Sequence, residues 1–197
     1  MIVLGLTGSI GMGKSTTAAM FADIGIPVND ADAVVHSLYQ GEAVAPIEAA
    51  FPGATKGGAV DRSELSRQLA ENPALFARLE AIVHPLVRER EKVFLQHHSA
   101  NGAPLVVLDI PLLFETKAQN RVDAVAVVSC DAQIQKERVM KRPGMTAEKF
   151  ALILSRQVPD HEKRAKADYI IDTGHGLDSA RQQVSAIVHR LTSQKRP

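Results

Sequence analysis

The sequence predicts an α/β protein built on a mostly parallel β-sheet of five strands. Short apolar runs rich in β-branched residues recur along the chain, and longer segments with helical periodicity separate them. The runs are continuously apolar rather than alternating, as expected for parallel strands that are buried on both faces. The predicted strands are residues 2–6, 26–29, 105–108, 124–128 and 169–171.

Composition narrows the class of protein further. A length of 197 residues fits one domain with a modest insertion. The net charge of +1 gives no overall attraction to nucleic acid or to an anionic membrane, and aromatic residues, at 4% with no Trp, leave few platforms for stacking bases. The most apolar stretch, residues 104–114, is interrupted by Asp109 and is too short to span a bilayer. We expect a cytoplasmic protein that binds neither nucleic acid nor membrane.

The single cysteine and the N-terminal residues also favour a cytoplasmic location. Cys130 is the only cysteine and ends an apolar run, so we expect a buried, inert thiol in a reducing compartment. The apolar residues 1–6 lack a basic segment before them and lead directly into a glycine-rich turn, which is not the pattern of a signal peptide.

Residues 33–102 carry no strand signal comparable to the five runs and are predicted to form a helical insertion after the second strand. Asp61 and the pair Asn72-Pro73 are typical helix starts, with an acceptor side chain or a proline at the first turn. Gly53–Gly58 is interpreted as a loop, and His84-Pro85 as a turn that begins a helix.

Residues 131–166 form a second distinctive segment. They hold nine basic and five acidic residues, a net charge of +4, and their helical pattern is broken at Pro143-Gly144 and at Pro159. We predict a small basic lid here. The nucleotide-binding core is then assigned to residues 1–32, 103–130 and 167–197, with a last helix over 179–192 and a frayed tail at 195–197.

The motif that carries chemistry follows the first strand. Residues 8–15, Gly-Ser-Ile-Gly-Met-Gly-Lys-Ser, match the phosphate-binding pattern G-x-x-x-x-G-K-[ST]. Such glycines let the backbone turn several N–H groups toward one anion, and the following helix adds its N-terminal dipole. In this pattern Lys14 holds the β- and γ-phosphates of a nucleotide and the hydroxyl of Ser15 binds Mg²⁺. The backbone of residues 11–16 completes the predicted site. Its members are Gly11, Met12, Gly13, Lys14, Ser15 and Thr16.

Two carboxylates follow the second strand. Asp30 and Asp32 lie at the carboxyl end of that strand, where ligands of open α/β folds bind. Two negative charges near a triphosphate are unfavourable unless they handle a metal or a substrate proton, although capping of the next helix would also explain them. The Asn/Thr-Lys-x-Asp element by which GTPases recognise their base is absent from the sequence.

With these elements in place, the chain resembles the dephospho-CoA kinase family over nearly its whole length. The order and spacing of the matching segments carry the resemblance. The segments are residues 5–16, 30–32, 61–62, 84–85, 111–115, 135–142, 156–157 and 167–168. The family usually has Gly at the position of Ser9, Ile or Val at Asn29 and Asn at Thr173, so the fine structure of those turns is expected to differ.

The resemblance implies a P-loop, nucleoside-kinase-like three-layer fold with a five-stranded parallel sheet, a helical substrate-binding insertion at 33–102 and a lid at 131–166. It implies transfer of the γ-phosphoryl group of ATP to the ribose 3′-hydroxyl of dephospho-CoA, with Mg²⁺, as the last step of coenzyme A synthesis. Asp32, rather than Asp30, would take the proton of the attacking hydroxyl, and Asp30 would help to hold water on the metal.

The remaining roles are assigned with alternatives. Arg138 and Arg142, four residues apart on one helix face, would neutralise transferred phosphate, Arg138 as a catalytic and Arg142 as a nucleotide-binding residue; a solvated face paired with acidic neighbours is the alternative. The acceptor would contact Arg62, His84 and Arg88. Asp109 would reach the metal through water. Weaker candidates are Glu115 near Asp109, and Gln157 and Arg164 in the lid.

Two other functions stay open on the residues alone. One is another P-loop kinase acting on a nucleotide or a sugar acid. The other is a nucleotide-dependent switch that transfers no phosphoryl group, although Asp32 and the basic segment favour transfer.

Overall fold

The computed structural model describes residues 1–193, and the chain forms two compact units. Unit 1 contains Met1–Asn29 and the chain from His98 onward, and unit 2 is Asp30–His97. The boundaries fall within strand β2 (Val28–Asp30) and helix α5 (Leu75–Ala100). The predicted insertion covers most of unit 2, the predicted lid belongs to unit 1, and the tail at 195–197 lies outside the described residues.

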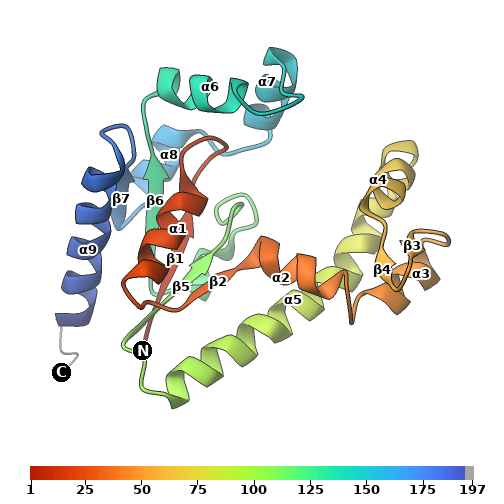
Figure 1. The fold of residues 1–197 in the computed structure, drawn as a ribbon, viewed down its shortest axis with the longest axis horizontal. Helices are drawn as coiled ribbons and strands as arrows, with labels where there is room; N and C mark the ends of the chain where they lie inside the picture. Colours follow the sequence, from red (N-terminus) through yellow and green to blue (C-terminus); the bar gives the residue numbers. More distant parts are fainter. Residues whose placement is uncertain (194–197) are drawn as a thin grey trace. The chain divides into compact units, whose positions relative to one another are not determined.

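Unit 1 is built on the predicted five-stranded sheet, which confirms the α/β class (Figure 1). The strand order is β2-β5-β1-β6-β7, and β1 pairs in parallel with both β5 and β6. All five predicted strands are present within a few residues of their expected bounds. Besides β2 they are β1 (Ile2–Thr7), β5 (Leu105–Asp109), β6 (Ala124–Ser129) and β7 (Tyr169–Asp172).

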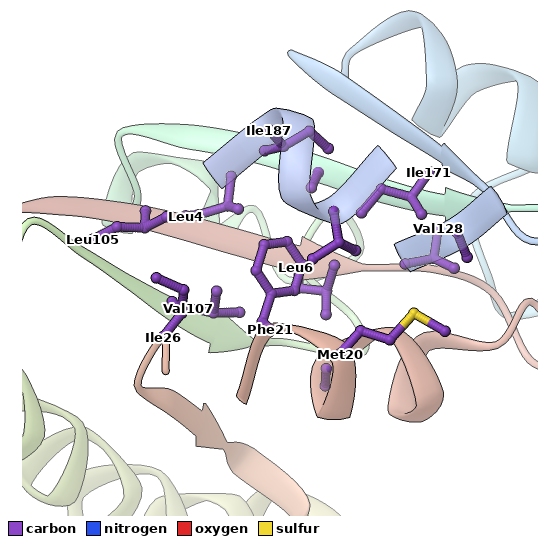
Figure 2. Packing of buried hydrophobic residues seen from close by; sticks show 14 of the residues in the cluster. Leu4, Leu6, Met20, Phe21, Ile26, Leu105, Val107, Val128, Ile171 and Ile187 are labelled. Atoms are coloured by element: carbon purple, nitrogen blue, oxygen red, sulfur yellow. The ribbon is translucent and has the colours of Figure 1, made fainter. Parts of the chain in front are cut away.

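The two faces of this sheet are covered differently. Helices α1 (Lys14–Asp23) and α9 (Leu177–Ser193) cover one face, where Leu6, Phe21 and Ile187 pack together with residues of β5 and β6 (Figure 2). On the other face Leu113 packs against β6, and it lies so close to β1 that a Cβ on Gly5 would be 2.8 Å from the Cδ1 atom of Leu113. This close approach of Leu113 leaves no room for a side chain at position 5.

The basic segment folds into three short helices with the predicted breaks. They are α6 (Ala132–Met140), α7 (Ala147–Ser155) and α8 (Asp160–Ala165). Gly144, with φ of 70°, lies in the turn between α6 and α7, and Pro159 is the N-cap of α8. A short 3₁₀ helix, η1 (Ala118–Arg121), precedes β6.

Unit 2 packs four helices and a hairpin around an apolar cluster of its own. Asp30 and Asp61 cap two of the helices, each accepting hydrogen bonds from two backbone N–H groups of the following turn. Leu38, Ile47 and Phe51 are fully buried in the cluster. The helices besides α5 are α2 (Ala31–Leu38), α3 (Val44–Ala50) and α4 (Arg62–Glu71).

The prediction that Gly53–Gly58 is a loop is wrong in part, because this segment contains a short strand and the turn of a hairpin. Strands β3 (Thr55–Lys56) and β4 (Ala59–Val60) pair in an antiparallel hairpin. Its two central residues, Gly57 and Gly58, have φ of 61° and 80°, as a two-residue turn with positive φ at both positions requires. The glycines are therefore the turn of a hairpin whose strands are too short to show periodicity.

The prediction that His84-Pro85 begins a helix is also wrong. Helix α5 runs without interruption through Pro85, which has no N–H to donate to the carbonyl of Ala81. The apolar face of the helix continues on both sides of the proline, where Leu79, Val83 and Leu86 contact the unit 2 core. This packing offsets the lost hydrogen bond. No helix within residues 1–193 is long and apolar enough to cross a membrane.

Candidate active site

The phosphate-binding motif forms a tight loop between β1 and α1. Gly11 and Gly13 have φ of 79° and 93°, a region that glycine enters without strain. A Cβ on Gly8 would lie 2.7 Å from the carbonyl oxygen of Val128, and one on Gly11 would collide with the side chain of Val139 on α6. The loop is therefore packed between β6 and α6, and only glycine fits at these positions.

This loop presents unpaired N–H groups to one side. Gly13 is the N-cap of α1 and has no side chain to bond the first turn, whose N–H groups have no partner within the helix. Within residues 1–193, the N–H groups of Gly11 and Gly13 donate to no protein acceptor. Met12 differs, because its N–H donates to the Ser9 carbonyl and its side chain is buried against Cys130. Such a loop at a helix N-terminus binds anions.

Lys14 and Asp109, two predicted site residues, form an ion pair. The Nζ atom of Lys14 lies 2.5 Å from Oδ1 of Asp109, and the Asp109 side chain is only 2% exposed. Asp109 ends β5, next to β1, so the parallel sheet places the carboxylate beside the loop. The lysine is thus held at the mouth of the loop before a phosphate binds.

The residues at this position fit a magnesium ion that is shared with phosphates. Mg²⁺ keeps several waters and takes only one or two protein oxygens where substrate phosphates complete its coordination. Ser15 is exposed in the first turn of α1, and the Asp109 carboxylate is held beside the loop by its pair with Lys14. Among the described residues no group of three or more His, Cys, Asp or Glu side chains could hold a metal unaided.

A cavity of about 320 Å³ extends from the loop toward the start of α9. Its walls come from the phosphate loop, α1, α6 and the turn after β7, and include Thr16, Arg138, Arg142 and Leu177. Arg138 donates to both the Oγ1 and the carbonyl oxygen of Thr173, each at 2.8 Å. Thr173 donates in turn to the Met12 carbonyl, so the arginine is tied to the loop through one side chain.

Cys130 is buried, as predicted, and its Sγ atom lies 3.6 Å from Nη1 of Arg138. Burial raises the pKa of its thiol, and the nearby Arg138 guanidinium opposes that shift. A thiol with a raised pKa is a weak nucleophile, which fits the expected inert role.

Unit 2 has a cavity of its own, with a volume of about 470 Å³. Its wall combines apolar side chains with four polar ones, Asp32, Tyr39, Arg62 and Ser66. The guanidinium of Arg62 lies over the Tyr39 ring, 5.3 Å from its centre, and its Nη2 atom is 3.3 Å from Nδ1 of His36. Burial raises the pKa of the Tyr39 hydroxyl despite the opposing charge of Arg62. The cavity therefore offers one cation and one anion above an apolar floor.

The two candidate aspartates of unit 2 have different surroundings. Asp30 Oδ1 accepts hydrogen bonds from the N–H groups of Asp32 and Ala33, which caps α2. The Asp32 side chain is exposed and lines the cavity. Capping thus explains Asp30 but leaves the carboxylate of Asp32 available for a substrate.

Three other predicted residues, His84, Arg88 and Glu115, do not line either cavity. His84 and Arg88 lie four residues apart on α5, exposed, and neither lines the unit 2 cavity. Glu115, expected to help near the metal, instead pairs with the fully buried Lys163 at 2.9 Å and accepts from the N–H of Val158. Burial raises the pKa of Glu115, but these hydrogen bonds outweigh it and the net shift is downward.

Several contacts at these sites were not expected. Tyr39 and His36 precede Arg62 by more than twenty positions, and the contacts of Gln135 and Gln157 with the phosphate loop bridge more than a hundred. Sequence spacing carries no signal for such contacts. The only signal was the presence of both glutamines in the segments that carry the family resemblance.

A parallel α/β sheet, a phosphate loop and a basic segment beside it define a P-loop kinase. The fold agrees with a shikimate kinase from Bacteroides thetaiotaomicron, which superposes with a TM-score of 0.53 at 17% identity and covers 96% of this chain and 98% of the other. The family model for dephospho-CoA kinase matches residues 2–179, and the chain belongs to the dephospho-CoA kinase family.

Individual relatives agree with this assignment. The dephospho-CoA kinase of Rhizobium meliloti is 66% identical over 191 residues, which cover 97% of this chain and 98% of the relative. That of Agrobacterium fabrum is 59% identical, with 97% and 98% covered. The dephospho-CoA kinase structure from Campylobacter jejuni has a TM-score of 0.74 at 25% identity and covers 96% of each chain. The predicted family, fold and kinase class are confirmed.

Proposed function

We propose that this kinase transfers the γ-phosphoryl group of ATP to the ribose 3′-hydroxyl of dephospho-CoA, giving coenzyme A and ADP. Family membership carries the choice of acceptor. The observation that most supports phosphoryl transfer is the Lys14–Asp109 pair at the mouth of a loop whose N–H groups are free to bind phosphate.

In this proposal unit 1 binds ATP. The loop N–H groups and Lys14 hold the phosphates, while the cavity beside Thr173 and Leu177 receives the nucleoside. Bound Mg²⁺ would supply charge neutralisation, held by the Ser15 hydroxyl and through water by Asp109. Arg142, at the rim of the cavity, is suited to reach phosphate, whereas Arg138 would first have to leave Thr173 or act on the nucleoside side.

Asp32 is proposed to orient the acceptor. The 3′-oxygen attacks the γ-phosphorus, the bond from that phosphorus to the bridging oxygen of ADP breaks, and the hydroxyl proton passes to the Asp32 carboxylate. A weak base suffices because the proton leaves late in a loose transition state. Support comes from the exposed carboxylate of Asp32, which the cap at Asp30 leaves unused.

Unit 2 is proposed to bind the rest of the acceptor. Its cavity combines an apolar floor with the Arg62 guanidinium, as a ligand with an aliphatic arm and phosphates requires. His84 and Arg88 would extend this site along α5. The residues 131–166 are proposed to act as the lid. Use of ATP and of a coenzyme A precursor also favours a cytoplasmic location, which we include in the proposal.

The test is an acceptor panel with ADP release as the readout. The wild-type enzyme receives ATP, Mg²⁺ and, in separate reactions, dephospho-CoA, AMP, adenosine or shikimate. We expect kcat/KM for dephospho-CoA to exceed the others by at least about 10³-fold. A preference for a nucleoside monophosphate would support another small-molecule kinase, and ADP release that is independent of any acceptor would support a nucleotide switch.

A further inference from the structure

Residue Ile10, at the apex of the phosphate loop, is held by two glutamine side chains. Gln157 Oε1 accepts a hydrogen bond from the Ile10 N–H at 3.1 Å, and Gln135 Nε2 donates to the Ile10 carbonyl at 2.7 Å. Gln135 is buried, with 6% of its surface exposed. A backbone N–H can only donate and a carbonyl can only accept, so the direction of both bonds is fixed.

Both glutamines are themselves well anchored. Gln135 lies on α6, and a Cβ on Gly11 would lie 3.1 Å from the Gln135 carbonyl oxygen, so the helix packs directly on the loop. Gln157 is followed by Val158, whose N–H donates to Glu115 at 2.8 Å, and Glu115 pairs with the fully buried Lys163. The glutamines therefore tie the loop to α6 and to the segment that Glu115 and Lys163 hold.

The bond from Gln135 also determines the direction of a neighbouring N–H group. The Ile10 carbonyl and the Gly11 N–H belong to one planar trans peptide, so they point in opposite directions. When the carbonyl is fixed on Gln135, the Gly11 N–H is turned away from α6, and it has no protein acceptor within residues 1–193. Glycine at position 11 would otherwise permit this peptide to flip at little cost.

We propose that Gln135 and Gln157 are positioning residues for the nucleotide. Gln135 keeps the Ile10–Gly11 peptide in the orientation that presents the Gly11 N–H to phosphate, and Gln157 keeps the preceding Ile10 N–H out of the anion site. This proposal rests on the proposed use of ATP but not on the identity of the acceptor. The segments on both sides of α7 thereby set the shape of the phosphate loop.

A pair of isosteric substitutions tests the proposal. Glutamate retains the acceptor oxygen of glutamine and loses its donor, so Gln157→Glu keeps its hydrogen bond and Gln135→Glu loses it. Both add the same negative charge beside the same residue, so any general charge effect is shared. Gln133→Glu is a control for added charge on α6, because the Gln133 side chain lies on the same helix and donates to Glu137.

The first readout is the Kd for a non-hydrolysable ATP analogue, measured by calorimetry without an acceptor. We expect Gln135→Glu to raise Kd about 30-fold, Gln157→Glu about 3-fold or less and Gln133→Glu hardly at all, because only the first leaves a buried carbonyl without its donor. In turnover, KM for ATP should rise with Kd while kcat stays within about twofold, since the lost interaction is present in ground and transition states alike.

Several results would overturn the inference. Equal Kd values for the two glutamate variants would mean that the hydrogen bonds do not matter. A lower melting temperature with unchanged Kd would give both glutamines a structural role only. If Gln135→Glu fails to fold, Gln135→Met, which removes the donor without adding charge, should raise Kd about tenfold, and an unchanged value would contradict the proposal. Failure of the acceptor assignment would leave these Kd values unaffected.

Discussion

Units 1 and 2 bury different kinds of side chains. Every buried polar or charged side chain among the described residues lies in unit 1, whereas the buried residues of unit 2 are apolar. Some of these unit 1 side chains belong to the predicted phosphate site or support it. The full set of buried polar or charged residues is Thr7, Ser9, Thr17, Asp109, Ser129, Gln135, Lys163 and Thr173.

This difference indicates two ways of preparing a binding site. Buried polar groups are costly unless their hydrogen bonds are made, so they fix a geometry in advance. Unit 1 uses them to hold a loop for phosphates, where alignment governs the rate of transfer. Unit 2 instead places Asp32, Tyr39 and Arg62 at the wall of a cavity beside an apolar core.

The largest effect on catalysis is expected from substitution of Lys14 in the phosphate loop of unit 1. Lys14→Met should lower kcat/KM at least about 10³-fold, because it removes a charge that the transition state uses and the buried Asp109 carboxylate loses its cation. Steady-state kinetics measures the loss. Lys92→Met is the control, since Lys92 is exposed and pairs with Glu89 on the same helix. Turnover of the Lys14 variant within tenfold of wild type would contradict the assignment.

The next largest effect concerns the two aspartates of unit 2. Asp32→Asn should lower kcat by about 10²- to 10³-fold through loss of the general base. Asp30→Asn should leave kcat nearly unchanged, because asparagine caps a helix as well as aspartate does. The ratio of the two kcat values is the measurement. A reversed ratio would transfer the proposed role to Asp30.

A third prediction concerns the buried pair of unit 1. Glu115→Gln should cost about 3 kcal/mol of unfolding free energy at pH 7, because the fully buried Lys163 loses its partner. The pKa of Glu115 is lowered in the folded protein. Its contribution is therefore present above the ordinary carboxyl pKa and is lost as the pH falls through the folded-state pKa.

Denaturant unfolding at several pH values checks this sign. The difference between wild type and Glu115→Gln should shrink steadily at pH values below about 4. If the difference is constant with pH, the Glu115 carboxylate does not carry the stabilisation.

The smallest effect on catalysis is expected from a substitution at the unit 2 cavity. Arg62→Ala should raise KM for dephospho-CoA about tenfold and leave KM for ATP unchanged, as expected for a partly exposed cation that binds phosphate. Arg67→Ala on the same helix is the matched control, because Arg67 pairs with Glu64 and Glu71 at the surface. A rise in KM for ATP instead would mean that the units do not divide the substrates in this way.

The sequence predicted most of unit 1 because its signals are local. Continuous apolar runs mark parallel strands, and the glycine pattern at residues 8–15 marks the loop by requirements of the backbone alone. Unit 2 was predicted less well. Its hairpin strands have two residues each, and α5 continues through Pro85 because tertiary packing outweighs the local preference.

The contacts that support the phosphate loop could not be predicted from residue spacing. The contacts from Gln135 and Gln157 to Ile10, and from Glu115 to Lys163, join residues that only the folded chain brings together. No spacing rule relates them. Local chemistry thus predicts which residues bind phosphate, and the three-dimensional structure shows what holds those residues in place.

The most direct test of the proposed function follows phosphorus through the reaction. Phosphorus NMR of the enzyme with ATP, Mg²⁺ and dephospho-CoA records ADP and any new phosphomonoester in the same sample. We predict that a 3′-phosphomonoester of the acceptor appears in equal amount to ADP. Accumulation of ADP with inorganic phosphate, and without that phosphomonoester, would contradict it.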